Sequence, residues 1–206
     1  MILMLNSHIQ TTSLSAHSMP PQVLGMEALI TREVSNTHKL LYQHLQTIRS
    51  IPLLQNTTAV LSFESNLAFE SQHLLHYLHS VNFKKWVSLA EGAQNSLGWL
   101  TTHGRKESMA LLLRECLRVG KVSYSEFFFS LSMSKQEAKK RAGSEIRNFS
   151  VITEPGKTAF AKSRKTYTGK LGGQQDDCVI ALQLALIAQR TFFEDGRYSN
   201  FSSQPI

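Results

Sequence analysis

Residues 165–189 read KTYTGKLGGQQDDCVIALQLALIAQ, a basic, glycine-containing segment that runs into a long apolar helix. Asp176 and Asp177 stand side by side at the junction, and only three aspartates occur in the chain. Adjacent carboxylates repel each other and are costly to hold beside an apolar wall unless a cation or a helix terminus compensates them. The junction is therefore a candidate metal site beside a phosphate-binding loop.

The aspartate pair also has a purely structural interpretation. An aspartate that starts a helix can cap free backbone N–H groups with its side chain. A cap needs only one aspartate, however, and the second stands near Gly172 and Gly173 with lysines on the flank. The pair therefore favours a cation site, with helix capping as the alternative.

Bulk composition limits the class of protein. The chain has 206 residues, of which 42% are apolar, and this suits one globular domain with a proper core. Two cysteines, Cys116 and Cys178, are too few for a disulfide scaffold or a cysteine zinc cluster, so a reducing, intracellular environment fits best. The N-terminal segment has a five-residue apolar run without a basic flank, which resembles neither a secretory signal nor a membrane span.

The net charge of +7 is unevenly distributed along the chain. Residues 135–170 contain ten lysines and arginines against three acids, which by itself gives +7. Clustered basic residues of this kind suit a polyphosphate backbone. A solvated helix face followed by a mobile basic loop is the alternative interpretation.

Hydrophobic periodicity, punctuated by glycine and proline, predicts strands that alternate with helices. The predicted strands are 23–31, 57–65 and 83–89, and the predicted helices are 36–48, 66–80, 106–119, 135–148 and 176–193. A loop is predicted at 92–104, and a basic loop joins the last two helices. Residues 122–131 fit either a strand or an aromatic turn. The alternation predicts an α/β sheet with helices on both faces.

Glu64 follows the apolar stretch AVLSF at the carboxyl end of a predicted strand. Ligands gather beyond the carboxyl ends of strands in open α/β sheets, although a lone glutamate there can equally be exposed and inert. Together with the aspartate pair, Glu64 suits metal-assisted phosphodiester hydrolysis. Mg²⁺ or Mn²⁺ binds carboxylate oxygens and water, and two ions about 4 Å apart can activate the attacking water and stabilise the leaving oxygen.

Nucleotide motifs are missing from the sequence. The string EPGKT at 154–158 imitates the end of a P-loop, but Val151 stands where GxxxxGK[ST] requires glycine. The missing glycine excludes ATPase activity in the chain. A small-molecule α/β enzyme is the least favoured class, because the sequence has no nucleotide-binding motif.

Four segments occur in an order that resembles one protein family. They are VLGMEALITR, VLSFESNLAFESQHLLHYLHS with an E-x-N signature at Glu64 and Asn66, GWLTTHGRKESMALLLRECLRVGKV, and KTYTGKLGGQQDDCVIALQLAL. The last segment is similar to the family's Tyr-Ser/Thr-Gly-Lys, glycine, Asp-Asp ending. The family is the C-terminal nuclease domain of the large terminase subunit, which packages DNA in herpesviruses and tailed phages. The herpesvirus type is the more similar, and the resemblance covers about residues 22–194.

The resemblance implies an RNase H-like mixed sheet flanked by helices. It also implies a two-metal endonuclease, dependent on Mg²⁺ or Mn²⁺, that cuts concatemeric double-stranded DNA during genome packaging. Glu64 would be the second catalytic acid and a metal ligand, and Asp176 or Asp177 would be the third. We expect these three acids to form the catalytic and metal site.

The resemblance also implies partners. Lys165 and Lys170 would lie near the DNA backbone, and we expect Lys162 and Arg164 of the same run to contact DNA as well. A portal protein, a small terminase subunit and an ATPase domain of the same or a spliced polypeptide would associate with the chain. The location would be the host cell nucleus for a herpesvirus-type protein and the host cytoplasm otherwise.

One departure from the family concerns its first catalytic acid, an aspartate on the opening strand. No aspartate precedes Asp176 in this sequence, and neither Glu27 nor Glu33 has the expected context. We therefore expect a leader at 1–21 with a partial strand, a nuclease domain at 22–194 and a polar tail at 195–206, with the first strand and the ATPase domain encoded upstream. A non-catalytic DNA-binding or assembly fragment of a packaging motor that has lost the first aspartate is the alternative function.

Overall fold

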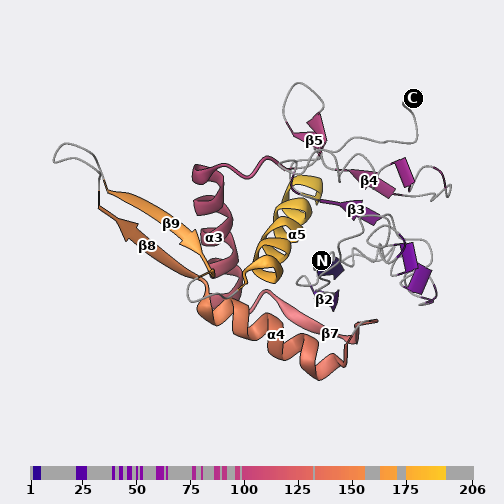
Figure 1. Ribbon diagram of the computed structural model, residues 1–206. Coiled ribbons are helices and arrows are strands. Elements are labelled where there is room, and N and C mark those ends of the chain that lie inside the picture. The colour runs from indigo at the N-terminus through magenta and orange to yellow at the C-terminus, as the bar shows by residue number, and fades with distance from the viewer. Residues whose placement is uncertain are drawn as a thin grey trace, which may run out of the picture. The chain divides into compact units, whose positions relative to one another are not determined.

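A computed structural model describes most of the second half of the chain and parts of the first. The residues described are 2–5, 22–26, 39, 42–43, 46–47, 50, 52, 59–62, 64, 76–77, 80, 86–88, 90–91, 96–97, 99–131, 133–155, 163–170 and 175–193. The chain divides into two compact units, Met1–Ala28 with Thr102–Leu186 and Leu29–Thr101 with Ile187–Ile206. Both helices and strands are present (Figure 1), so the fold is mixed α/β.

The first unit contains a three-stranded sheet of order β1–β2–β7. Its strands are β1 (Ile2–Leu5), β2 (Gln22–Met26) and β7 (Ser123–Phe129). β1 runs antiparallel to β2, and β2 runs parallel to β7 with Val23 opposite Tyr124. The segment that the sequence left open between strand and turn is therefore a strand. The predicted strand at 23–31 is confirmed at its beginning, and its residues 27–31 lie outside the described residues.

Helix α3 spans His103–Arg118 and has a defined signal at each end. The Thr102 hydroxyl accepts a hydrogen bond from the backbone N–H of Arg105 at 3.4 Å, which caps the first turn. The chain leaves the helix through Gly120, whose φ of 66° lies in the left-handed region that favours glycine. The helix begins three residues before the predicted start at 106 because Thr102 supplies the cap.

Helix α4 spans Lys135–Asn148, as the sequence predicts. Its N-terminus is a capping box in which the Ser134 hydroxyl accepts from the Glu137 N–H at 3.2 Å. In return, the Ser134 N–H donates to the Glu137 carboxylate at 2.9 Å. Two backbone donors that the helix leaves unpaired are satisfied in this way, which fixes where α4 begins.

Strands β8 (Ser150–Glu154) and β9 (Arg164–Thr168) pair antiparallel, with Val151 opposite Tyr167. The predicted basic loop is therefore wrong at these residues, because both strands contain short runs of β-branched and aromatic residues, 151–153 and 166–168, which favour strands. Figure 1 shows the two strands beside α3. The Tyr167 hydroxyl donates to the Glu107 carboxylate of α3 at 2.7 Å, which attaches β9 to that helix.

The core of the first unit forms around α5 (Asp177–Phe193), which begins one residue after the predicted start. A helix that is apolar on nearly all sides belongs inside a domain. Buried residues of α5 pack against α3, β7 and α4. The core residues are Leu113, Phe128, Ala138, Ala142, Cys178, Val179, Leu182 and Leu186.

The second unit contains two short strand pairs. β3 (Ala59–Leu61) runs parallel to β4 (Trp86–Ser88), and β5 (Ala90–Glu91) runs antiparallel to β6 (Ser96–Leu97). The predicted strands at 57–65 and 83–89 contain β3 and β4. The predicted loop at 92–104 is wrong where β6 forms a ladder with β5 and where α3 starts.

The structure also describes parts of the two predicted helices at 36–48 and 66–80. Every residue that it describes inside those ranges is helical. None of the helices among the described residues is both long enough and apolar enough to span a membrane.

The packing of α5 yields a stability prediction. Leu182→Ala removes a side chain that is 3% exposed in the core, so we expect the free energy of unfolding to fall by about 2–5 kcal/mol in urea denaturation. Val151→Ala on β8, at a position 51% exposed, should change it by less than about 0.5 kcal/mol. Equal effects of the two substitutions would contradict the placement of this core.

Candidate metal centre at the start of α5

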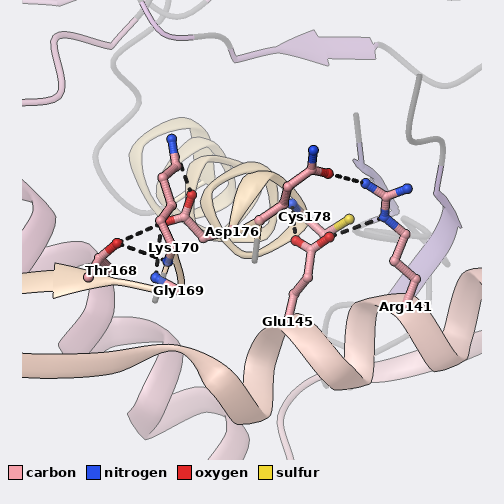
Figure 2. Close-up of polar contacts among 8 residues, drawn as sticks. Arg141, Glu145, Thr168, Gly169, Lys170, Asp176 and Cys178 are labelled. Carbon is pink, nitrogen blue, oxygen red and sulfur yellow. Dashed lines mark hydrogen bonds and ion pairs between the residues drawn. The ribbon is translucent and has the colours of Figure 1, made fainter. Parts of the chain in front are cut away.

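Asp176 stands immediately before α5, and its backbone carbonyl accepts the Ile180 N–H at 2.9 Å as the helix begins. Its carboxylate is 5% exposed and does not cap the helix. Instead, Oδ2 accepts from the Gly169 N–H at 3.0 Å and from the Thr168 hydroxyl at 3.5 Å (Figure 2). Lys170 Nζ lies 3.6 Å from Oδ1. Asp176 is therefore tied to the end of β9 by three successive residues.

Gly169 allows this close approach between β9 and α5. A Cβ atom at position 169 would lie 2.8 Å from the Cβ of Asp176 and 3.6 Å from its Cα. Contacts under 3.0 Å are too short for real Cβ atoms, so a larger residue requires the backbone to move. The glycine of the Tyr-Thr-Gly-Lys segment therefore serves the contact with Asp176.

Asp177 differs from Asp176 in its surroundings although the two are adjacent. It lies in the first turn of α5 and is exposed. Among the residues that the structure describes, its carboxylate makes no hydrogen bond or ion pair. The positive end of the helix macrodipole stabilises a negative charge at this position. Asp177 thus presents a free carboxylate beside an anchored one.

Two residues of α4 contact the chain on either side of the aspartate pair. The Cys178 N–H donates to Glu145 Oε2 at 2.7 Å, and Glu145 Oε1 accepts from Arg141 Nε at 3.2 Å. Arg141 also donates through Nη2 to the side chain of Gln175 at 2.7 Å (Figure 2). We call Arg141 and Glu145 the α4 bracket. Neither residue is predicted as functional from the sequence, in which their signal is a spacing of four residues on a predicted helix.

Cys178 is 2% exposed and follows the aspartate pair directly. Burial raises the pKa of its thiol to about 12, and the neighbouring Glu145 carboxylate acts in the same direction. The thiol is therefore protonated at neutral pH and packs as a small apolar group.

Glu64 lies in the second unit, beyond the end of β3, and it is half-buried. Its backbone forms an isolated parallel bridge with Trp99. The expected location after the carboxyl end of a strand is confirmed. The aspartate pair belongs to the first unit, so the grouping of the three acids stays a prediction.

The four basic residues expected at DNA have different environments. Lys165 is exposed in the middle of β9, opposite Thr153. Arg164 begins β9 opposite Glu154, and Lys162 lies outside the described residues. Lys170 is 67% exposed but lies close to the Asp176 carboxylate. Lys165 is therefore the predicted DNA contact with the clearest outward position.

Carboxylate oxygens are the ligands that hard divalent cations prefer, so the exposed Asp177 and the neighbouring Asp176 fit one side of such a site. Asp176 already accepts two hydrogen bonds and contacts Lys170, which leaves Asp177 as the less encumbered donor. Within the described part of the chain, no group of three or more His, Cys, Asp or Glu side chains has an arrangement that could hold a metal ion.

The mixed α/β fold is consistent with the RNase H-like fold that the sequence predicts. The chain is similar in structure to the human cytomegalovirus terminase nuclease domain, solved after soaking with Mn and with an inhibitor bound. The TM-score is 0.57 at 10% sequence identity, over 89% of this chain and 77% of the other. No protein-family model and no curated protein matches the sequence. At this identity the likeness establishes the fold.

The contact between Gly169 and Asp176 yields a second prediction. Gly169→Ala should lower the free energy of unfolding by about 1–3 kcal/mol, because the added methyl overpacks a backbone contact. Gly104→Ala in α3 is the matched control, since nothing lies within 4 Å of a Cβ there and alanine favours helix. Chemical denaturation measures both, and an unchanged stability for Gly169→Ala would show that the contact is not tight.

Proposed function

We propose that the chain is the nuclease domain of a viral terminase large subunit of the herpesvirus type, a metal-dependent endonuclease that cuts concatemeric double-stranded DNA. The observation that carries the proposal is the free Asp177 carboxylate beside the anchored Asp176 at the start of a buried helix. The fold supports it, because the similar structure is a terminase nuclease domain that was soaked with Mn. The sequence supports it through the ordered motifs that end in the Asp-Asp pair.

In this proposal Asp177 is a direct ligand of a divalent cation, Mg²⁺ or Mn²⁺, and Asp176 contributes the carboxylate oxygen nearer to Lys170. Glu64 is a further ligand and catalytic acid. When bound, the cations would activate water and stabilise the leaving oxygen of the phosphodiester. Lys170 offsets part of the repulsion between the adjacent carboxylates, since its Nζ lies 3.6 Å from Asp176 Oδ1.

DNA is the proposed substrate because β9 and α4, the two elements that contact residues 175–178, carry exposed basic residues. Lys165 is exposed on β9, and Lys140 and Arg147 are exposed on α4. Arg164, Lys162 and Lys170 complete the proposed contacts with phosphate. Contacts of this type position the nucleic acid without reading its sequence. We therefore expect the chain to bind double-stranded DNA with little sequence preference.

Assembly and location belong to the same proposal. The chain associates with a portal protein, a small terminase subunit and an ATPase domain of the same or a spliced polypeptide. A herpesvirus-type protein functions in the host cell nucleus, and a phage-type protein in the host cytoplasm. These proposals rest on the sequence motifs.

A non-catalytic DNA-binding or assembly fragment is the second candidate function. The observation that favours it is that Asp176, one of the two candidate ligands at the start of α5, already has three partners from residues 168–170. The two functions differ in what happens after DNA binding, since only the first leads to cleavage.

The nuclease proposal predicts the effect of removing the free carboxylate. Asp177→Ala should lower the rate of nicking of supercoiled plasmid DNA in Mn²⁺ by about 100-fold or more, because such losses follow removal of a group that acts in the transition state. Glu115→Gln is the control, since it removes an exposed carboxylate of α3 whose ion pair is with Arg118 of the same helix. Undiminished nicking by the Asp176→Ala, Asp177→Ala double variant would refute the site. The nicking and binding assays use a chain restored at its N-terminus with the upstream strand that is expected to carry the first aspartate. Binding by that chain without cleavage would support the second candidate.

The DNA proposal predicts a dependence on salt. Lys165→Ala should weaken binding to unrelated duplexes equally and reduce the slope of log affinity against log salt by about 1. Lys121→Ala, at an exposed position after α3, removes a lysine outside the basic segment and should leave the slope unchanged. Fluorescence anisotropy titrations at several salt concentrations measure both. An unchanged slope for Lys165→Ala would exclude a phosphate contact there.

A further inference from the structure

The start of α5 has an unusual cap. The first four N–H groups of a helix have no acceptor within the helix, and the residue before the helix commonly supplies one with its side chain. The side chain of Asp176 is directed to Gly169 and Thr168 instead. The acceptor for the second residue, Cys178, is Glu145 on α4, which is 33 positions earlier in the chain. A distant glutamate thus replaces the local cap.

Glu145 is well suited to hold this turn in one place. It is 7% exposed, and a buried carboxylate is tolerated only when it is paired and hydrogen-bonded. Arg141 supplies the opposite charge at 3.2 Å, and the Cys178 N–H supplies a 2.7 Å hydrogen bond that adds to the attraction of the helix terminus. Losing either partner would leave a buried charge uncompensated.

The α4 bracket contacts the chain on both sides of the aspartates. Arg141 holds the Gln175 side chain just before them, and Glu145 holds the Cys178 backbone just after them. Both oxygens of Glu145 are already used, one by Arg141 and one by Cys178. Glu145 is therefore placed to fix the turn.

We propose that Glu145 is a positioning residue, which fixes the first turn of α5 from α4 and so holds the Asp177 carboxylate in place for a divalent cation. The inference rests on the proposed function, because it assigns a role to Asp177. Asp177 itself has no side-chain partner among the described residues, so its location depends on the backbone that carries it. Groups that orient metal ligands without touching the metal typically matter about 10- to 100-fold for affinity.

The test compares Glu145→Ala, which removes the acceptor, with Glu145→Gln, which keeps an acceptor oxygen for the Cys178 N–H. Leu113→Ala is the control for a general loss of stability, because Leu113 is an apolar core residue of α3 that supplies no acceptor to the Cys178 N–H. All three are made in the full 206-residue chain. Thermal unfolding establishes that the variants are folded at the temperature of measurement.

The first measurement is amide hydrogen exchange of Cys178 by NMR, which requires no metal. We expect exchange to accelerate at least about tenfold in Glu145→Ala relative to Ile180, because the Ile180 N–H keeps its acceptor, the Asp176 carbonyl. Glu145→Gln and Leu113→Ala should retain protection at Cys178. Equal acceleration at both amides, or none at Cys178, would overturn the proposal.

The second measurement is the dissociation constant of Mn²⁺, by titration calorimetry. Glu145→Ala should weaken binding about tenfold, whereas Glu145→Gln and Leu113→Ala should stay within about threefold of the wild type. Unchanged affinity in Glu145→Ala would overturn the positioning role, and so would an equal loss in Glu145→Gln, which would make charge the cause. Absence of Mn²⁺ binding by the wild type would contradict the proposed function, while the exchange measurement would still decide whether Glu145 holds the turn.

Discussion

The burial of α5 is the constraint on which the rest of the first unit depends. A helix packed on α3, β7 and α4 must still satisfy the polar groups at its N-terminus. Glu145 satisfies a backbone donor of α5, and Asp176 in turn accepts from the backbone at the end of β9. The position of the acidic pair therefore follows from how α4 and β9 contact the N-terminal end of α5.

Local signals made part of this structure predictable. The bounds of α4 follow from a capping box between Ser134 and Glu137, and the position of α5 follows from its apolar composition. The hairpin of β8 and β9 is not predicted, because lysines and arginines dominate the composition of residues 135–170 as a whole. The strand signal lies in short runs of β-branched and aromatic residues at 151–153 and 166–168. The composition of a segment also does not indicate which other segment it will pair with as a strand.

The candidate site is likewise predictable from the sequence only in part. The sequence identified the Asp-Asp pair but left open which aspartate serves as ligand, since the two differ only in burial and partners. Glu145 could not be identified, because its partner is distant in sequence and an arginine–glutamate spacing of four is common on exposed helices. The grouping of Glu64 with the aspartate pair is still a prediction, because it too would join segments that are distant in the sequence.

The excess positive charge of residues 135–170 has two separate uses. Arg141 and Lys170 face carboxylates of the chain itself, Glu145 and Asp176. Lys140, Arg147 and Lys165 are exposed to solvent. A count of basic residues therefore overstates the charge that is free for an external polyanion, and internal neutralisation explains why an acidic pair is tolerated in a basic segment.

The contact between Gly169 and Asp176 couples two positions seven residues apart into one steric unit. Because the aspartate Cβ fills the space that a side chain at 169 would need, the two positions are constrained jointly during sequence divergence. A larger residue at 169 becomes acceptable only if the backbone moves apart or residue 176 becomes smaller, which removes the carboxylate. Loss of this glycine in a related chain would thus indicate that the acid is displaced or lost, even where the neighbouring Asp177 is retained.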